Sequence, residues 1–162
     1  MLNNYFSADE IEYLKNVDEL RRAIILIETL YPARKSLTGD DYALYLTKIS
    51  YLVDTKEEKT AALLMTVIRD FFDEGEKMLI DLGFSDKVIK LVKLISQNGH
   101  ETLSELTMRV LKSQNQKACN ILYAALITYY NVNTLYNVDE NTYKLIVAEF
   151  EEPVMLIRKR YD

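Results

Sequence analysis

The chain has few side chains that could catalyse a reaction or hold a transition metal. Its single histidine is His100 and its single cysteine is Cys119. A lone histidine leaves no second member for a His-based metal site or a catalytic triad, so we expect His100 at a helix start on the surface. No basic residue adjoins Cys119 to activate its thiol, and we expect a small buried apolar residue there.

Two charged groups remain as candidates for binding. Arg34 and Lys35 form a basic pair that could bind an anion, and a solvated loop is the alternative interpretation. An acidic run contains Asp70, Asp73, Glu74 and Glu76. Carboxylates of this kind could bind a hard cation such as Mg²⁺, although a solvated helix face explains them equally. The chain has no P-loop, dinucleotide-binding motif or zinc spacing.

Tyrosine is unusually frequent, with 12 in 162 residues. Four of these residues lie late in the chain: Tyr123, Tyr129, Tyr130 and Tyr136. A tyrosine buries a large ring and keeps a hydroxyl for hydrogen bonding. The cluster therefore fits either core packing or a binding surface.

Composition predicts one all-α domain over residues 1–162. An apolar content of 49% is enough for one compact core, and 4 Gly and 2 Pro leave little material for hairpins or linkers. The net charge of −5 argues against general nucleic-acid binding, which depends on a basic face. No pattern indicates an oligomeric state.

Cysteine usage and hydropathy predict a cytoplasmic protein without membrane association. One cysteine excludes an internal disulfide and fits a reducing compartment. No apolar stretch approaches the roughly 20 residues that span a bilayer, and the first residues have no secretory-signal pattern.

Cap signals and apolar periodicity predict eight or nine helices. Ser7 starts the first, Pro32 ends the second, and Asp41 caps the third. We expect a central buried helix over about 57–72, an acidic connector, and a short helix that stops at Gly83. The later helices are predicted at 88–95, started by Ser85-Asp86 and ended by Asn98-Gly99, and at 101–112, 118–130 and 141–161, with Pro153 kinking or splitting the last.

Four segments, in order, follow the pattern of one family. Residues 34–42 read Arg-Lys-Ser-Leu-Thr-Gly-Asp-Asp-Tyr, and residues 61–70 read Ala-Ala-Leu-Leu-Met-Thr-Val-Ile-Arg-Asp. Residues 82–88 read Leu-Gly-Phe-Ser-Asp-Lys-Val, and residues 121–126 read Ile-Leu-Tyr-Ala-Ala-Leu. In order and separation, over about residues 20–131, these segments resemble the HD-domain phosphohydrolases, most closely their (p)ppGpp-hydrolase branch. The second segment is similar to the family's Ala-Ala-Leu-Leu-His-Asp-Val-Ile-Glu-Asp.

The resemblance implies an HD-like helical bundle with the helix 141–161 added, and a metal site that has been lost. In the family, two His and two Asp hold a divalent cation that activates water for phosphoester hydrolysis. The resemblance assigns those four positions to Tyr45, Met65, Thr66 and Ala125. Phenol, thioether, hydroxyl and methyl groups cannot replace imidazole and carboxylate. We therefore expect no metal cofactor and no family hydrolysis, with these residues filling the former site as core.

The leading hypothesis is a pseudoenzyme that serves as a binding or regulatory module for a nucleotide or a protein partner. The resemblance assigns Arg34 and Lys35 to a position that approaches the nucleotide phosphates. It also matches Asp70 to the second residue of an acidic pair that helps to position the attacking water, with Arg69 standing for the first.

Two alternatives remain open. In the first, the chain is a metal-dependent (p)ppGpp or nucleotide pyrophosphohydrolase whose displaced site uses Asp70, Asp73 and Glu74 with Mg²⁺ or Mn²⁺. In the second, the chain is an unrelated helical protein-interaction module, in which Tyr45, Met65 and Ala125 do not converge.

Overall fold

The structure, a computed structural model, describes residues 1–161 and confirms the all-α prediction for them. They contain a short 3₁₀ helix, Leu2–Asn4, and one isolated backbone bridge between Lys35 and Asp41. Ten α-helices follow: α1 (Ala8–Asn16), α2 (Glu19–Leu30), α3 (Tyr42–Tyr51), α4 (Lys56–Leu64), α5 (Val67–Asp81), α6 (Asp86–Ile95), α7 (Leu103–Lys112), α8 (Gln116–Tyr129), α9 (Val132–Asn137) and α10 (Glu140–Arg158).

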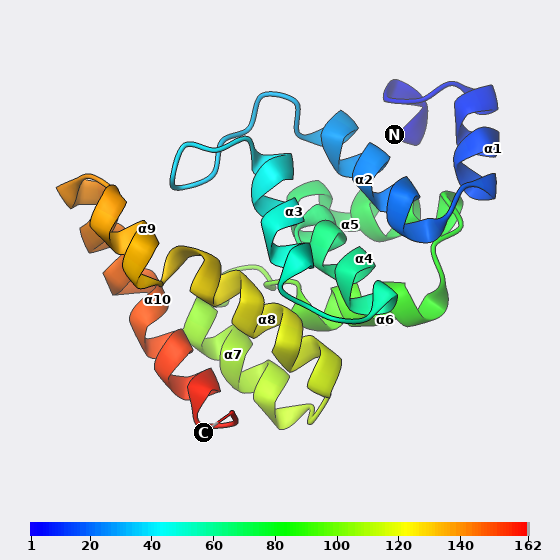
Figure 1. Cartoon of the computed structure of the whole chain (residues 1–162). Helices are drawn as coiled ribbons and strands as arrows, with labels where there is room; N and C mark the ends of the chain where they lie inside the picture. Colours follow the sequence, from blue (N-terminus) through cyan, green and yellow to red (C-terminus); the bar gives the residue numbers. More distant parts are fainter. Residues whose placement is uncertain (162) are drawn as a thin grey trace.

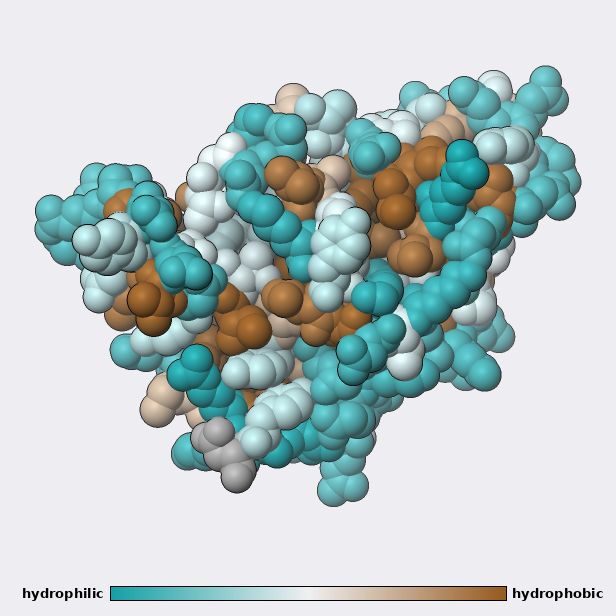
Figure 2. Space-filling model, in the orientation of Figure 1, coloured by the Kyte–Doolittle hydropathy of each residue, from teal (hydrophilic) through white to brown (hydrophobic). Residues whose placement is uncertain are grey.

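The helices surround α4, which lies against α2, α3, α6 and α8 (Figure 1). Six of the nine residues of α4 are buried, as predicted for the centre of the bundle. On the other side of α8, α10 packs against α7 and α8, while α9 lies at the outer edge with none of its residues buried. On the face shown in Figure 2, polar residues cover most of the surface, and apolar residues are exposed in patches.

Helix starts largely follow the cap signals. Ser7 forms the predicted capping box with Glu10, and Thr55 and Thr102 form two more, at α4 and α7. Asp41 does precede α3, but its side chain makes no cap hydrogen bond. The Asp41 carboxylate pairs instead with Lys35 across the preceding loop. It therefore stabilises the loop and does not cap the N-terminus of α3.

The helix predicted over residues 57–72 is divided at Met65 and Thr66, and this prediction was wrong. The hydroxyl of Ser96, at the end of α6, donates one proton that the carbonyl oxygens of Val92, at 2.8 Å, and Met65, at 3.0 Å, share. This hydrogen bond satisfies an acceptor that the helix would otherwise leave unpaired, so the chain can end α4 and start α5 in a new direction. The acidic stretch expected to be a connector is helical, within α5.

A second break lies inside α5, at Phe72. Its backbone has φ 47° and ψ −133°, a conformation that costs a residue with a side chain on the order of 1–3 kcal/mol, and its ring is 81% exposed. Beyond the break, Gly75 packs directly on the first turn of α5. A Cβ at Gly75 would lie 2.6 Å from the carbonyl oxygen of Val67 and 2.8 Å from the Cα of Ile68.

Two further differences concern helix ends. Gly99 has φ 41° but lies in the loop after α6, which ends at Ile95 because Ser96 is already extended. Pro153 lies within α10 and does not split it, and α9 was not predicted. No helix within residues 1–161 is long and apolar enough to cross a membrane.

We expect Gly75→Ala to lower the free energy of unfolding by about 1–3 kcal/mol, because the new methyl group meets backbone that cannot rotate away. Urea unfolding followed by circular dichroism measures the change. Glu74→Ala, at the adjacent exposed position, is the matched control and should change stability by less than about 0.5 kcal/mol. Equal stability of the two variants would contradict the packing argument.

Candidate functional site

The loop between α2 and α3 is folded tightly enough to hold its side chains in place. The Ser36 amide donates to the Asp40 carbonyl oxygen and the Tyr42 amide to that of Arg34, each at 2.9 Å. Gly39 turns the loop with φ 86°, a conformation that favours glycine. The amide of Leu37 donates to the hydroxyl of Tyr129 at 3.1 Å, which fastens the loop to α8.

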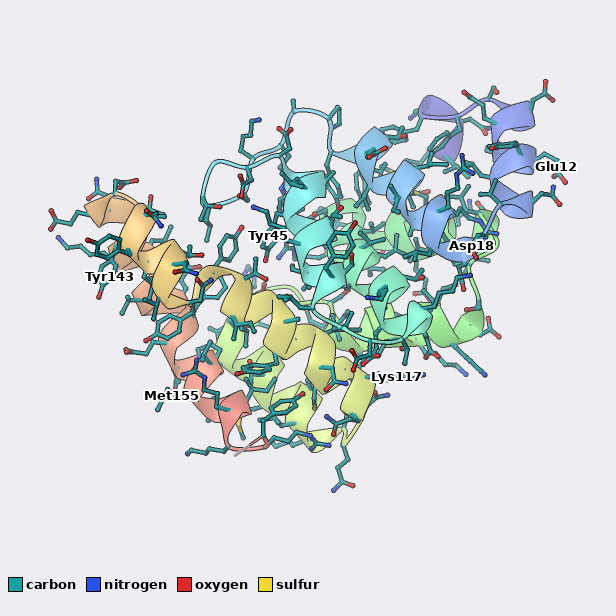
Figure 3. The ribbon with its side chains drawn as sticks, in the orientation of Figure 1. Glu12, Asp18, Tyr45, Lys117, Tyr143 and Met155 are labelled. Carbon is teal, nitrogen blue, oxygen red and sulfur yellow. The ribbon has the colours of Figure 1, made fainter. Side chains whose placement is uncertain are left out.

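A cavity of about 280 Å³ lies between this loop, the α4–α5 junction and helices α3, α6, α7, α8 and α10. All four positions that the resemblance assigns to metal ligands line this cavity: Tyr45, Met65, Thr66 and Ala125. Arg34 and Lys35 line it as well. Tyr45 points from α3 toward α8 (Figure 3). The structure therefore brings together six of the seven candidate site residues, and Asp70 lies just outside the lining.

The four residues that the resemblance assigns to ligand positions are largely core, as expected, yet they do not fill the space between them. Tyr45, Thr66 and Ala125 are buried, and Met65 is half-buried. Other residues, among them Ile95, Leu106 and Leu122, form the remaining walls of the cavity, and the space lies between them and these four residues.

Aromatic rings form one wall of the cavity. The rings of Tyr45 and Tyr129 are stacked, with centroids 4.6 Å apart and planes 16° apart. Phe150 of α10 meets Tyr129 edge-on at 5.2 Å. Burial raises the pKa of both the Tyr45 and Tyr129 hydroxyls, so both side chains are neutral at physiological pH.

The polar end of the site is organised by Asp70. One oxygen of its carboxylate accepts hydrogen bonds from Arg34 at 2.5 Å and from the Tyr31 hydroxyl at 3.0 Å. The other oxygen accepts from Nε of Arg69 at 3.1 Å. Burial alone would raise the pKa of Asp70, but the charges and hydrogen bonds of Arg69, Arg34 and Tyr31 outweigh it and hold the pKa below its usual value.

Both guanidinium groups are held in position by further contacts. The Arg34 guanidinium lies 3.9 Å from the ring centroid of Tyr42, a cation–π arrangement. Arg69 donates to the side-chain oxygen of Gln97 at 3.4 Å. Burial favours the neutral form of Arg34, but Tyr42 and Asp70 outweigh this and raise its pKa, so Arg34 stays charged.

The acidic run is not gathered into one site. Asp70 faces the two arginines, whereas Asp73 and Glu74 are exposed beyond the break at Phe72, and Glu76 pairs with Lys93 at 2.8 Å. Nowhere in residues 1–161 do three or more His, Cys, Asp or Glu side chains come together as metal ligands could. His100 is exposed, and Cys119 is fully buried, as predicted.

Several residues of the site were not singled out from the sequence: Tyr31, Tyr42, Arg69, Gln97 and Phe150. The sequence does mark Arg69 as unusual, since the resemblance expects an acidic residue at this position of the segment 61–70. The tyrosine count was a second signal. Among the late tyrosines, Tyr129 is buried in the core, as the packing interpretation predicted, whereas Tyr136 is 87% exposed and its interpretation as a binding surface stays a prediction.

We expect Asp70→Asn to lower the free energy of unfolding at neutral pH by about 1–2 kcal/mol, because two half-buried guanidiniums lose their shared counter-charge. The folded pKa lies below the unfolded value of about 3.9, so the stabilisation is complete above that value and is lost as the pH falls through the folded pKa. The difference from wild type should therefore shrink between about pH 4 and pH 2.

Urea titrations at several pH values test this expectation. Asp73→Asn, at an exposed position of the same run, is the control and should follow the wild type throughout. A difference between Asp70→Asn and wild type that stays constant with pH would show that the carboxylate charge is not responsible.

No protein-family model matches this chain, and no curated protein matches it either. Its function must therefore be inferred from the site itself. That site combines a mostly apolar cavity in the core with two charged guanidiniums at one end.

Proposed function

We propose that this protein is a metal-free binding module on an HD-type helical scaffold, related to the (p)ppGpp hydrolases but without their activity. The observation that supports the proposal best is that Tyr45, Met65, Thr66 and Ala125 all line one cavity. These residues come from α3, the α4–α5 junction and α8, which are far apart in the sequence. The alternative of an unrelated helical module predicted that Tyr45, Met65 and Ala125 would not converge, so their shared cavity supports the HD-type proposal over it.

The residues at the four positions do not fit a divalent cation. Met65 offers a thioether and Ala125 a methyl group, while the raised pKa of Tyr45 keeps its hydroxyl protonated. Arg34 and Arg69 also line the cavity, and their positive charges oppose a second cation at close range. Without a metal, nothing at this site lowers the pKa of an attacking water.

Binding remains because the cavity is still present and has a charged end. Mostly apolar walls with a few converging polar groups are the usual features of a small-molecule site. A ligand in this cavity would contact α3, α8 and α10 together, so its binding would stabilise the packing of these helices. A partner protein that recognises the stabilised packing would then bind differently with and without the ligand.

We expect purified protein to contain no stoichiometric Mn²⁺ and to release no pyrophosphate from ppGpp above background. Elemental analysis and a pyrophosphate-release assay measure these two properties. Stoichiometric metal together with turnover would refute the proposal. If turnover is found and is lost in Asp70→Ala but not in Asp73→Ala, the displaced-site alternative would gain support.

The relation to the HD scaffold has its own test. Rebuilding the ligand set with Tyr45→His, Met65→His, Thr66→Asp, Ala125→Asp and Arg69→Glu should create a site that binds Mn²⁺ at one ion per chain. Isothermal titration calorimetry measures the binding, and circular dichroism checks the fold. The control leaves Ala125 unchanged, removes one ligand and should bind more weakly. A folded five-fold variant that binds no Mn²⁺ would contradict the HD assignment.

A further inference from the structure

The size of the cavity limits what it can accept. Its volume is about 280 Å³. An engineered apolar cavity of about 150 Å³ accepts benzene, whereas pockets for drug-sized ligands cover about 300–1,000 Å³. The cavity is therefore large enough for one ring system with a short polar arm, and it is small for a nucleotide with several phosphates.

The shape of the walls favours a flat ligand. The stacked rings of Tyr45 and Tyr129, with Phe150 edge-on, form an aromatic wall. Leu106 and Leu122 are among the aliphatic residues that line the rest. A planar ring can stack on such aromatic rings or meet them edge-on. Each aromatic pair contributes about 0.5–1.5 kcal/mol beyond the contribution of the apolar area that the ring buries.

The charged end of the cavity favours an anion. Asp70 supplies one negative charge to two guanidiniums, so this half-buried cluster keeps one positive charge in excess. Each guanidinium has five N–H donors, and Asp70 and Gln97 accept only one or two from each. Because Arg34 is already held against Tyr42, little side-chain entropy is lost when it binds a carboxylate or phosphate group.

The other charged groups around the cavity act from more exposed positions. Lys35 pairs with Asp41, and both side chains are more than half exposed. Glu149 of α10 is exposed and is the one carboxylate among the lining residues of the described chain, where it opposes an anion. Solvent and salt screen these exposed charges more than the half-buried cluster of Arg34, Asp70 and Arg69.

We propose that the cavity binds a compact organic anion with a single planar ring system and one carboxylate or phosphate group. The ring lies in the aromatic part of the cavity, and the anionic group contacts Arg34 and Arg69. This inference rests on the proposed binding function and adds to it the chemical class of the ligand.

Three small probes of nearly the same shape test the proposal: benzoate, phenyl phosphate and the uncharged benzamide. Isothermal titration calorimetry and ligand-detected NMR on the full chain measure their affinities. We expect at least one of the two anions to bind about tenfold or more tightly than benzamide, as a hydrogen-bonded charge predicts. The ratio between benzoate and phenyl phosphate distinguishes the carboxylate from the phosphate.

Three variants test the geometry. Arg34→Gln should remove the preference for the anion over benzamide, and Glu149→Gln should strengthen anion binding. Ala125→Leu fills the cavity and should abolish binding of all three probes. Lys93→Gln, which removes a positive charge outside the cavity lining, should bind as wild type does. Thermal unfolding confirms that each variant is folded.

Two results would overturn the inference. One is equal affinity for benzoate, phenyl phosphate and benzamide. The other is no saturable binding of either anion up to about 10 mM, a dissociation constant that corresponds to a binding free energy of only a few kcal/mol. If ppGpp binds while both small anions do not, the ligand class is wrong and the proposed binding function stands. Metal content and pyrophosphate release decide the proposed function separately.

Discussion

The carboxylate of Asp70 joins three parts of the chain through polar contacts. Tyr31 follows the end of α2, Arg34 belongs to the loop before α3, and Arg69 shares the first turn of α5 with Asp70 itself. A half-buried carboxylate is costly unless it is paired, and here every partner is a charged or hydroxyl donor. The positions of both guanidiniums, and with them the charged end of the cavity, depend on this one group.

The division between α4 and α5 makes that arrangement possible. A continuous helix through Met65 and Thr66 would carry residues 66, 69 and 70 along the axis of α4. The hydrogen bond from Ser96 to the Met65 carbonyl lets the chain turn, and Thr66, Arg69 and Asp70 then share one face of a new first turn. Thr66 meets the Tyr31 hydroxyl at 3.2 Å, while Gly75 allows the later part of α5 to pack on that turn. The strained backbone of Phe72 accompanies this close packing.

The chemistry of the cavity is suited to an anion and poorly suited to a cation. Neutral phenols, a thioether and aliphatic groups surround it, and its charged end has two positive groups for one negative group. The four positions that the HD resemblance assigns to metal ligands hold only uncharged side chains, and all four line this cavity. Uncharged side chains can be buried there without the desolvation cost of an unpaired carboxylate.

The sequence by itself determined the all-α class, most helix starts and the presence of a central buried helix, although not where that helix ends. These properties depend on local composition, caps and apolar periodicity, which can be read over a few neighbouring residues. Through the family resemblance it also singled out Tyr45, Met65, Thr66 and Ala125 as one group. Only the tertiary structure decided that a cavity persists beside them, that Arg69 and Phe150 line it, and that Asp41 pairs with Lys35. Those features depend on how side chains from seven separate segments meet, and no local pattern contains the distances between them.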